Sequence, residues 1–470
     1  MVVRGVPRRL ARDGWWLDDA PPRRVAPVWL LLAVVICADL LVWGVAAGLG
    51  FVVCLLLVTA AVHLAVGQAV PLWRAMAAWG LLIVSLLPAV DLVQPLSVGF
   101  AVLGMLAFSA CMIVPDWDAS ALFRTALRLP GAGLVQTFRD AKNAKPSMPS
   151  KVAVGRVLTD WLVPLAVGGV FICLLALANP VVDAWLIRLG ALETGFSVDA
   201  GRVAFWGAVA LIAWPLLRLA VMKGTLNRPS RRIALPQSRL INGRSVLRAL
   251  VLFNLIFAVQ SLLDMGYLWG GVRLPAGMSY AEYAHRGAYP LLVAALLAGF
   301  FALISQPFAG DRPVLRILLY IWIGQTVLLV LSSILRLDLY VEAYGLTRLR
   351  FAAFIWMVLV ALGLVLMIMQ MMAKRSAGWF IARAAGLGLL ALYTVSLVNV
   401  DGFIARHNLA VGKVDGYYLC GLSEGAAPAL AAYGPPLCQR AVSVPQDWRA
   451  WGFRNARLRR SVAQMEEVQG

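Results

Sequence analysis

The sequence predicts an all-α, polytopic helical membrane protein with about eleven transmembrane helices and a small extracytoplasmic C-terminal tail. Of its 470 residues, 61% are apolar and 14% are charged, whereas soluble domains usually hold about 45–50% apolar and about 25% charged residues. Apolar runs of about 20 residues, the length that crosses a bilayer as a helix, recur along the whole chain. This pattern excludes an ordinary cytosolic enzyme, a disordered chain and a secreted disulfide scaffold.

The apolar runs divide the chain into three parts. Residues 1–26 form a basic N-terminus, 27–400 form the transmembrane domain, and 401–470 form a tail that we expect to pack on that domain. No small-residue cleavage site follows a short apolar core, so the first run is expected to be an uncleaved span. The expected spans cover 27–46, 48–67, 74–90, 95–115, 158–178, 203–221, 247–266, 286–305, 313–335, 350–371 and 379–400.

The basic residues predict the orientation of the chain in the membrane. Lys and Arg number 42 against 23 Asp and Glu, and membrane proteins concentrate basic residues in cytoplasmic loops. We therefore expect a cytoplasmic N-terminus and an external C-terminus. No basic stripe interleaves with aromatic residues, so we expect membrane lipids and no nucleic acid as partners, and protein partners stay unknown. The expected cytoplasmic loops are about 116–157 and 222–246, and the outer loops are about 179–202, 267–285 and 336–349.

The six cysteines fall into two groups. Four lie in apolar runs, where cysteine usually serves as a small packing residue. Cys420 and Cys438 are the pair in the polar tail, and they can form a disulfide if the tail faces an oxidising compartment. Such a bond would stabilise the tail by roughly 3 kcal/mol. Neither cysteine has the neighbours of a zinc site, and no cofactor motif is present, so we expect no metal and no cofactor.

Three short motifs have structural interpretations. Asp116-Trp117-Asp118 has the spacing of two carboxylates that share a divalent cation, but a helix-capping turn is the simpler interpretation. Gly421-Leu422-Ser423-Glu424-Gly425 matches a nucleophile elbow, which needs a strand before it and a helix after it; a small tail offers no such sheet. The Gly44-x-x-x-Gly48 spacing is typical of close helix packing.

Two segments between the spans have the pattern of helices that lie on a membrane surface. In 119–129 and in 181–192, apolar residues recur at helical spacing beside charged ones. The stretch 134–156, which holds Pro146 and Pro149, is expected to be a cytoplasmic loop.

Asp39 and His63 are ionisable residues inside two of the expected spans. Asp39 falls in the first span and His63 in the second, and a charge in hydrocarbon costs at least about 2.5–3.5 kcal/mol, so it normally has a partner or a function. One interpretation pairs these residues with a neighbouring span or a loop arginine. The other places them on a proton or cation path.

The strongest functional pattern is a polar cluster on the expected outer face. Arginine suits phosphate because its planar fork donates two hydrogen bonds at once, so Arg336, Arg348 and Arg406 are candidates to hold an anionic ligand. Glu282 and His285 are candidate general bases, although Glu282 and Arg286 also have the spacing of a helical ion pair. The candidate binding residues are Gln260, Asp264, Arg286, Arg336, Asp338, Glu342, Arg348, Asp401 and Arg406.

At this cluster the sequence resembles a known family. The run Asn254-Leu255-Ile256-Phe257-Ala258-Val259-Gln260, the run Tyr280-Ala281-Glu282-Tyr283-Ala284-His285-Arg286-Gly287 and the run Arg336-Leu337-Asp338-Leu339-Tyr340 carry the resemblance. It extends through Arg348 and Asp401 to Asp447-Trp448-Arg449. The family is a bacterial multi-pass membrane family known only as a domain of unknown function, of the 4153/4173 type. The resemblance implies a bacterial inner-membrane protein and supplies no catalytic residues; the Cys420/Cys438 pair departs from it.

These observations support three functional hypotheses. The leading one is a cell-envelope protein that binds, or modifies, an anionic lipid or lipid-linked intermediate at the outer face. The second is a proton-coupled secondary transporter or channel that uses Asp39 and His63. The third is a non-catalytic assembly partner or sensor. Whether the protein is an enzyme stays open.

Overall fold

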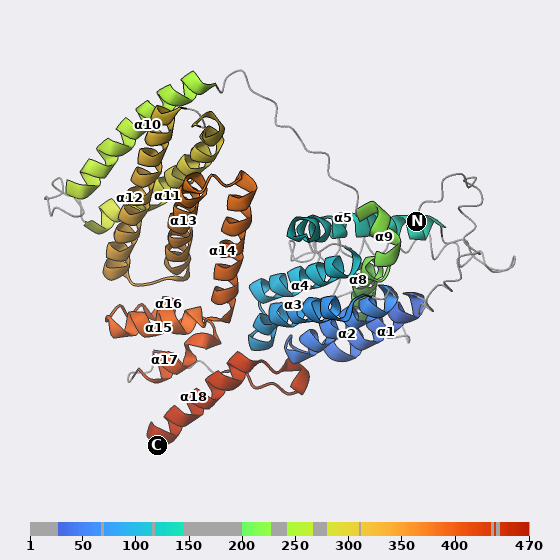
Figure 1. Cartoon of the computed structure of the whole chain (residues 1–470). Coiled ribbons are helices and arrows are strands. Elements are labelled where there is room, and N and C mark those ends of the chain that lie inside the picture. The colour runs from blue at the N-terminus through green and yellow to red at the C-terminus, as the bar shows by residue number, and fades with distance from the viewer. Residues whose placement is uncertain are drawn as a thin grey trace, which may run out of the picture. The chain divides into compact units, whose positions relative to one another are not determined.

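The computed structural model describes residues 27–66, 70–114, 118–143, 200–226, 242–266, 280–309, 312–433, 437–438 and 442–469. Every regular element in these ranges is a helix, which confirms the predicted all-α class for the described part of the chain. The chain divides into two compact units (Figure 1). Unit 1 comprises Met1–Ser230 with Pro445–Gly452, and unit 2 comprises Arg231–Val444 with Phe453–Gly470.

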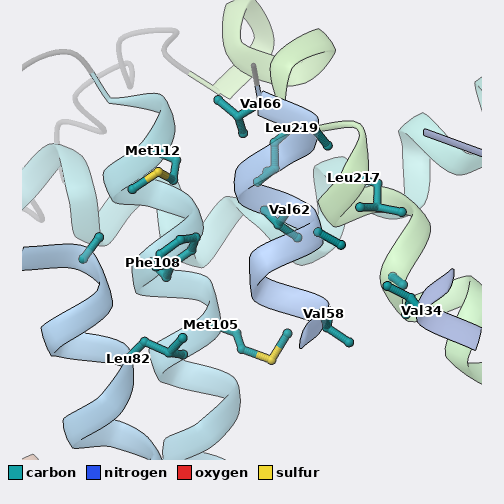
Figure 2. Close-up of a cluster of buried hydrophobic side chains, with 14 of the residues drawn as sticks. Val34, Val58, Val62, Val66, Leu82, Met105, Phe108, Met112, Leu217 and Leu219 are labelled. Carbon is teal, nitrogen blue, oxygen red and sulfur yellow. The ribbon is translucent and has the colours of Figure 1, made fainter. Parts of the chain in front are cut away.

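Unit 1 is built from long apolar helices and one amphipathic helix. Its buried side chains come from α1, α2, α3, α4, α5, α8 and α9 and meet in one cluster, in which Phe108 and Leu82 are fully buried (Figure 2). A Cβ added to Gly104 of α4 would collide with Ser85 of α3, so the missing side chain lets these helices approach closely. The helices are α1 (Pro27–Val42), α2 (Leu49–Val66), α3 (Leu72–Asp91), α4 (Pro95–Ile113), α5 (Ala119–Asn143), α8 (Ala200–Leu217) and α9 (Leu219–Leu226).

Unit 2 is organised around one long helix, α12 (Pro313–Tyr344), which packs against α10, α11 and α13. Trp322 of α12 is buried among Phe253, Phe257 and Phe301, and its indole N–H donates to Ala298 O at 3.2 Å. The other long helices are α10 (Gly243–Asp264), α11 (Tyr280–Ser305), α13 (Arg348–Met372) and α14 (Ala377–Leu397), and the short η3 (Gln306–Ala309) follows α11.

The tail contains mostly short helices. They are α15 (Val400–Ala410), α16 (Gly416–Cys420), η4 (Glu424–Ala426), α17 (Ala427–Ala431), η5 (Trp448–Ala450) and α18 (Phe453–Gln469). Of these, η5 belongs to unit 1 and the others belong to unit 2. The tail therefore contributes to both units.

Eight described helices are long and apolar enough to cross a membrane: α2, α3, α4, α8, α10, α12, α13 and α14. Two shorter apolar helical segments, Pro27–Val42 and Val293–Phe308, fall on two further expected spans. The chain is therefore a multi-pass membrane protein by helix length and composition. The expected span 158–178 lies outside the described residues, as does the expected surface helix 181–192, so the total of eleven spans stays a prediction.

Several helices extend beyond the limits predicted from hydropathy. The amphipathic α5 includes the expected surface helix 119–129 and continues to Asn143, so the first part of the expected loop 134–156 is helical. Most of the expected outer loop 336–349 is the end of α12, which stops at Gly345 with a φ of 78°. Glycine adopts this left-handed conformation without strain. Hydropathy windows end where side chains turn polar, whereas the backbone hydrogen bonds of a helix continue past that point.

Candidate functional site

The first part of the tail covers one end of unit 2, where α12 meets α13. The backbone N–H of Leu346 donates to Asn408 Oδ1 at 2.7 Å, and Asn408 Nδ2 donates back to Leu346 O at 2.9 Å. The backbone N–H of Arg348 donates to the Tyr418 hydroxyl at 2.8 Å. We call this end, formed by the turn 345–347 with α15 and α16, the tail end of unit 2. It holds the candidate residues of α12, α13 and α15.

A disulfide closes the tail at this end. It joins Cys420, the last residue of α16, to Cys438, with a Cα–Cα distance of 6.0 Å. Leu419 and Leu422, on either side of this helix end, are buried in the core of unit 2. The disulfide therefore closes a loop whose first residue, Cys420, lies next to side chains in the core of unit 2.

Arg348 and Asp401 form a two-pronged ion pair between α13 and α15. Arg348 Nε donates to Asp401 Oδ1 at 2.7 Å, Arg348 NH2 donates to Oδ2 at 2.5 Å, and the backbone N–H of Ser423 also donates to Oδ2 at 2.9 Å. Burial raises the pKa of Asp401, but the hydrogen bonds from Arg348 and Ser423 outweigh it and lower this pKa to about 2. The guanidinium that we expected to hold phosphate is therefore already bound to a carboxylate.

Arg336 is also bound to a carboxylate, at a more buried position. Its NH2 group donates to Asp264 Oδ1, and Gln260 Nε2 donates to the same oxygen at 2.8 Å. The side chains of Arg336 and Asp264 are only 3% and 2% exposed. Asp264 Oδ2 is buried and has no hydrogen-bond partner among the described residues. Asp264 and Arg336 thus form a buried pair, with the half-buried Gln260 beside it, and not an open binding surface.

Three candidate side chains remain exposed. Asp338 and Glu342 lie one turn apart near the end of α12, and Arg406 lies on α15. Arg406 forms no ion pair within the described ranges. Of the three arginines predicted to hold phosphate, Arg406 is the one that keeps its whole guanidinium available.

The candidate catalytic residues belong to the start of α11. Glu282, His285 and Arg286 belong to the first turns of α11, and their side chains lie outside the described ones. No group of three or more His, Cys, Asp or Glu side chains that could hold a metal ion occurs in the searched part of the chain. The arrangement at the tail end of unit 2 therefore favours binding, and it identifies no reacting group.

The intramembrane residues of unit 1 lie in different surroundings. Asp39 accepts from Arg202 Nε at 2.7 Å, from Arg202 NH2 at 2.5 Å and from Trp206 Nε1 at 2.8 Å. Its partner Arg202 was expected in an outer loop and lies in the first turn of α8, so Asp39 is paired, as one of the two interpretations predicted. The ring of His63 lies beside those of Trp79 and Phe108, with its centroid 6.4 Å from each of theirs, and those two rings are themselves 5.0 Å apart. Its Nδ1 is buried without a partner among the described residues.

The sequence did not predict the docking of the tail on unit 1. The backbone N–H of Leu49 donates to Trp451 O at 2.8 Å, and Arg449 NH1 donates to Leu40 O at 2.5 Å. A Cβ on Gly48 would lie 2.5 Å from the carbonyl carbon of Ala450. The Gly44-x-x-x-Gly48 spacing therefore does not mark helix-to-helix packing. Gly44 lies in a turn with a φ of 70°, and Gly48 admits the backbone of the tail.

The two other motifs take ordinary structural positions. The side chain of Asp118 accepts from the backbone N–H groups of Ser120 and Ala121 at 3.2 Å, so it caps α5; Asp116 and Trp117 lie outside the described residues. The Gly421–Gly425 motif lies between α16 and η4, with a helix and not a strand before it. Its serine contributes the backbone N–H that binds Asp401.

Comparison with known proteins places this arrangement in one family. The family model described as a domain of unknown function (DUF4153) matches residues 39–433. The chain belongs to the DUF4153 family. The match begins at Asp39 and includes all the ion pairs described above, but it ends before Cys438 and the docked segment 445–452. No curated protein and no solved structure matches the chain.

Proposed function

We propose that this DUF4153 protein is a bacterial inner-membrane protein with a cytoplasmic N-terminus, and that its α15 surface binds anionic phospholipid headgroups on the external side. We define the α15 surface as the exposed side chains of Phe403, Arg406 and Val411, with Leu349 of α13 and Tyr417 of α16. Membrane-surface helices typically combine exposed apolar side chains with basic ones.

The observation that carries this proposal is the position of α15. This helix begins three residues after the end of α14, a candidate membrane span, so it starts where the chain leaves the hydrocarbon. It directs Phe403 and Arg406 outward, while Ile404, Ala405 and Asn408 are buried. Leu349 and Tyr417 adjoin Arg348 and Tyr418, which bind each other, so their exposed apolar groups lie beside α15.

The charges favour an anionic headgroup. Arg406 makes no ion pair with the described residues. The neighbouring Arg348 is 52% exposed, and its ion pair with Asp401 uses only its Nε and NH2 groups. A guanidinium fork matches two phosphate oxygens. The proposal concerns binding, because the described side chains include no group positioned to modify a lipid.

The test is a crosslinking experiment with a local readout. The protein is reconstituted with phosphatidylglycerol or phosphatidylcholine that carries a photoreactive group at the headgroup, and crosslinked peptides are identified by mass spectrometry. In the wild type, we expect phosphatidylglycerol to label residues 400–414 more than phosphatidylcholine does. Arg406→Ala should reduce this preference about fivefold, since one basic residue near an anionic surface contributes about 1 kcal/mol.

A matched control separates α15 from the total charge of the protein. Arg383 of α14 is also exposed and lies over the ring of Trp379 at 4.0 Å. Arg383→Ala removes the same charge and should leave the labelling of residues 400–414 unchanged. Equal labelling by the two lipids in the wild type, or equal loss in both variants, would overturn the proposal.

The transporter hypothesis has less support than the lipid hypothesis. Arg202 and Trp206 donate to both carboxylate oxygens of Asp39, so this residue already has a structural partner. Neutralising Asp39 in a vesicle uptake assay tests this hypothesis directly. An assembly or sensor role predicts a stable protein that co-purifies with the chain.

A further inference from the structure

Helix α10 has two faces of opposite character. One face exposes large apolar side chains, including Leu255, Val259 and Leu262, as expected of a helix surrounded by lipid. The other face meets α12 and carries Asn254, Ser261 and Asp264. With about 3.6 residues per turn, these three positions fall on one side of the helix. The polar side chains of α10 are therefore not spread around it.

These three residues present buried oxygen atoms that lack donors. Asn254 Oδ1, Ser261 Oγ and Asp264 Oδ2 are all buried, and none has a hydrogen-bond partner among the described residues. The amide nitrogen of Asn254 donates to Leu250 O at 2.7 Å and to Leu318 O at 3.2 Å, so its oxygen must find a donor elsewhere. Buried polar atoms in proteins are nearly always paired, directly or through water.

The charge of the site selects the kind of donor. Asp264 and Arg336 together are neutral and almost fully buried. An added cation would leave a net positive charge in the membrane next to a guanidinium, which is costly. An anion would face the acceptor oxygens of Asn254 and Asp264, and it would leave a net negative charge in the membrane. A neutral O–H or N–H donor satisfies the oxygens without adding charge.

We propose that the α10–α12 interface binds neutral hydrogen-bond donors at Ser261 and Asp264, supplied by water or by the hydroxyl groups of a small polyol. Asp264 Oδ1 is held by Arg336 and Gln260, and Oδ2 accepts from the bound donor. Ser261, one turn before Asp264 on the same face, supplies a second contact. The interface of these two membrane helices is thus hydrated at the end that holds the ion pair, while the lipid face of α10 is dry.

The test compares two adjacent cysteines. Ser261→Cys and Leu262→Cys are made separately in a chain whose Cys37, Cys54, Cys111 and Cys173 are alanine, and each is treated in intact cells with a small methanethiosulfonate reagent. Leu262 is the matched control because it lies one residue away and is 68% exposed on the apolar face. The reagent attacks the thiolate, which forms in water and is suppressed in an apolar medium, so Ser261→Cys should react at least about tenfold faster. Denatured samples of both variants should react equally.

Two further measurements complete the test. Labelling in the presence of glycerol identifies the source of the donor, because slower labelling indicates a bound polyol and unchanged labelling indicates water. Hydroxyl-radical footprinting of the unmodified protein requires no variant to fold. It should oxidise Phe257, which lies between Asn254 and Ser261 along α10, when water is bound there. Equal reactivity of the two cysteines, or an unoxidised Phe257, would overturn the proposal.

Discussion

Each unit contains an aspartate–arginine pair between helices, and the two pairs differ in completeness. In unit 1, Asp39 receives three hydrogen bonds from Arg202 and Trp206, and Arg202 is 45% exposed. In unit 2, Asp264 is held through one oxygen, and both partners are nearly fully buried. The exposed pair is geometrically satisfied, whereas one carboxylate oxygen of the buried pair has no donor among the residues that the structure describes.

This difference separates a structural contact from a candidate site. The two-pronged pair in unit 1 connects two helices, and each carboxylate oxygen of Asp39 has a donor. Burying an incomplete pair carries a desolvation cost, so its persistence requires a further partner. The same two residue types thus connect helices in unit 1 and define a binding position in unit 2.

The largest effect is expected from Asp264→Ala. This change leaves the Arg336 guanidinium buried without its carboxylate, which should destabilise unit 2 by about 3–5 kcal/mol. Thermal unfolding of the detergent-solubilised protein measures the loss. The control is the double variant Asp264→Leu/Arg336→Leu, which removes both charges and should recover most of the stability. A double variant as unstable as the single one would contradict the ion-pair explanation.

The disulfide is expected to have the next largest effect. Replacing Cys420 and Cys438 by alanine opens a loop of 18 residues, and should destabilise the tail by about 3 kcal/mol. Limited proteolysis of the tail, with and without reductant, measures this change. In intact cells, an external tail also predicts that a membrane-impermeant maleimide labels these cysteines only after reduction. Labelling that requires permeabilisation of the cells would show that the tail faces the cytoplasm, which is the opposite of the proposed orientation.

A third pair, Arg348–Asp401, should make stability depend on pH. The pKa of Asp401 in the folded protein is about 2, below its usual value of about 3.9. The carboxylate therefore stabilises the fold above about pH 4, and this contribution is lost as the pH falls from about 4 towards 2. Because Arg348 is half exposed, we expect a loss of about 1–2 kcal/mol. In Asp401→Asn, the melting temperature should change less between about pH 4 and pH 2 than it does in the wild type. An equal change in both proteins would exclude Asp401 as the source of the pH dependence.

Asp39→Asn should have the smallest effect of the four. Its partner Arg202 is 45% exposed, so the loss of the carboxylate charge leaves no fully buried, uncompensated cation. The melting temperature should fall less than it does in Asp264→Ala under the same conditions. An equal or larger fall in melting temperature would contradict the view that the buried Asp264–Arg336 pair matters more to stability than the exposed Asp39–Arg202 pair.

Part of the site could be predicted from the sequence and part could not. The spacing of Gln260 and Asp264 placed them on one helix face, and they do form a hydrogen bond. The partner of Asp264, however, is 72 residues away, and that of Asp39 is 163 residues away. No local pattern selects one arginine from 42 basic residues. Residue type alone therefore predicted phosphate binding by Arg336 and Arg348, although both are bound to carboxylates.

The sequence by itself determined the class of the protein. Apolar runs, basic loops and a pair of tail cysteines predict a helical membrane protein, because hydropathy and backbone hydrogen bonding act within a single segment. The tertiary structure decided which charges are paired, where the tail docks on unit 1, and which oxygens stay open. Those outcomes depend on the rotation and packing of helices distant in the chain. A one-residue change in helix rotation would exchange a lipid-facing leucine for the buried Asp264, and the sequence alone does not fix that rotation.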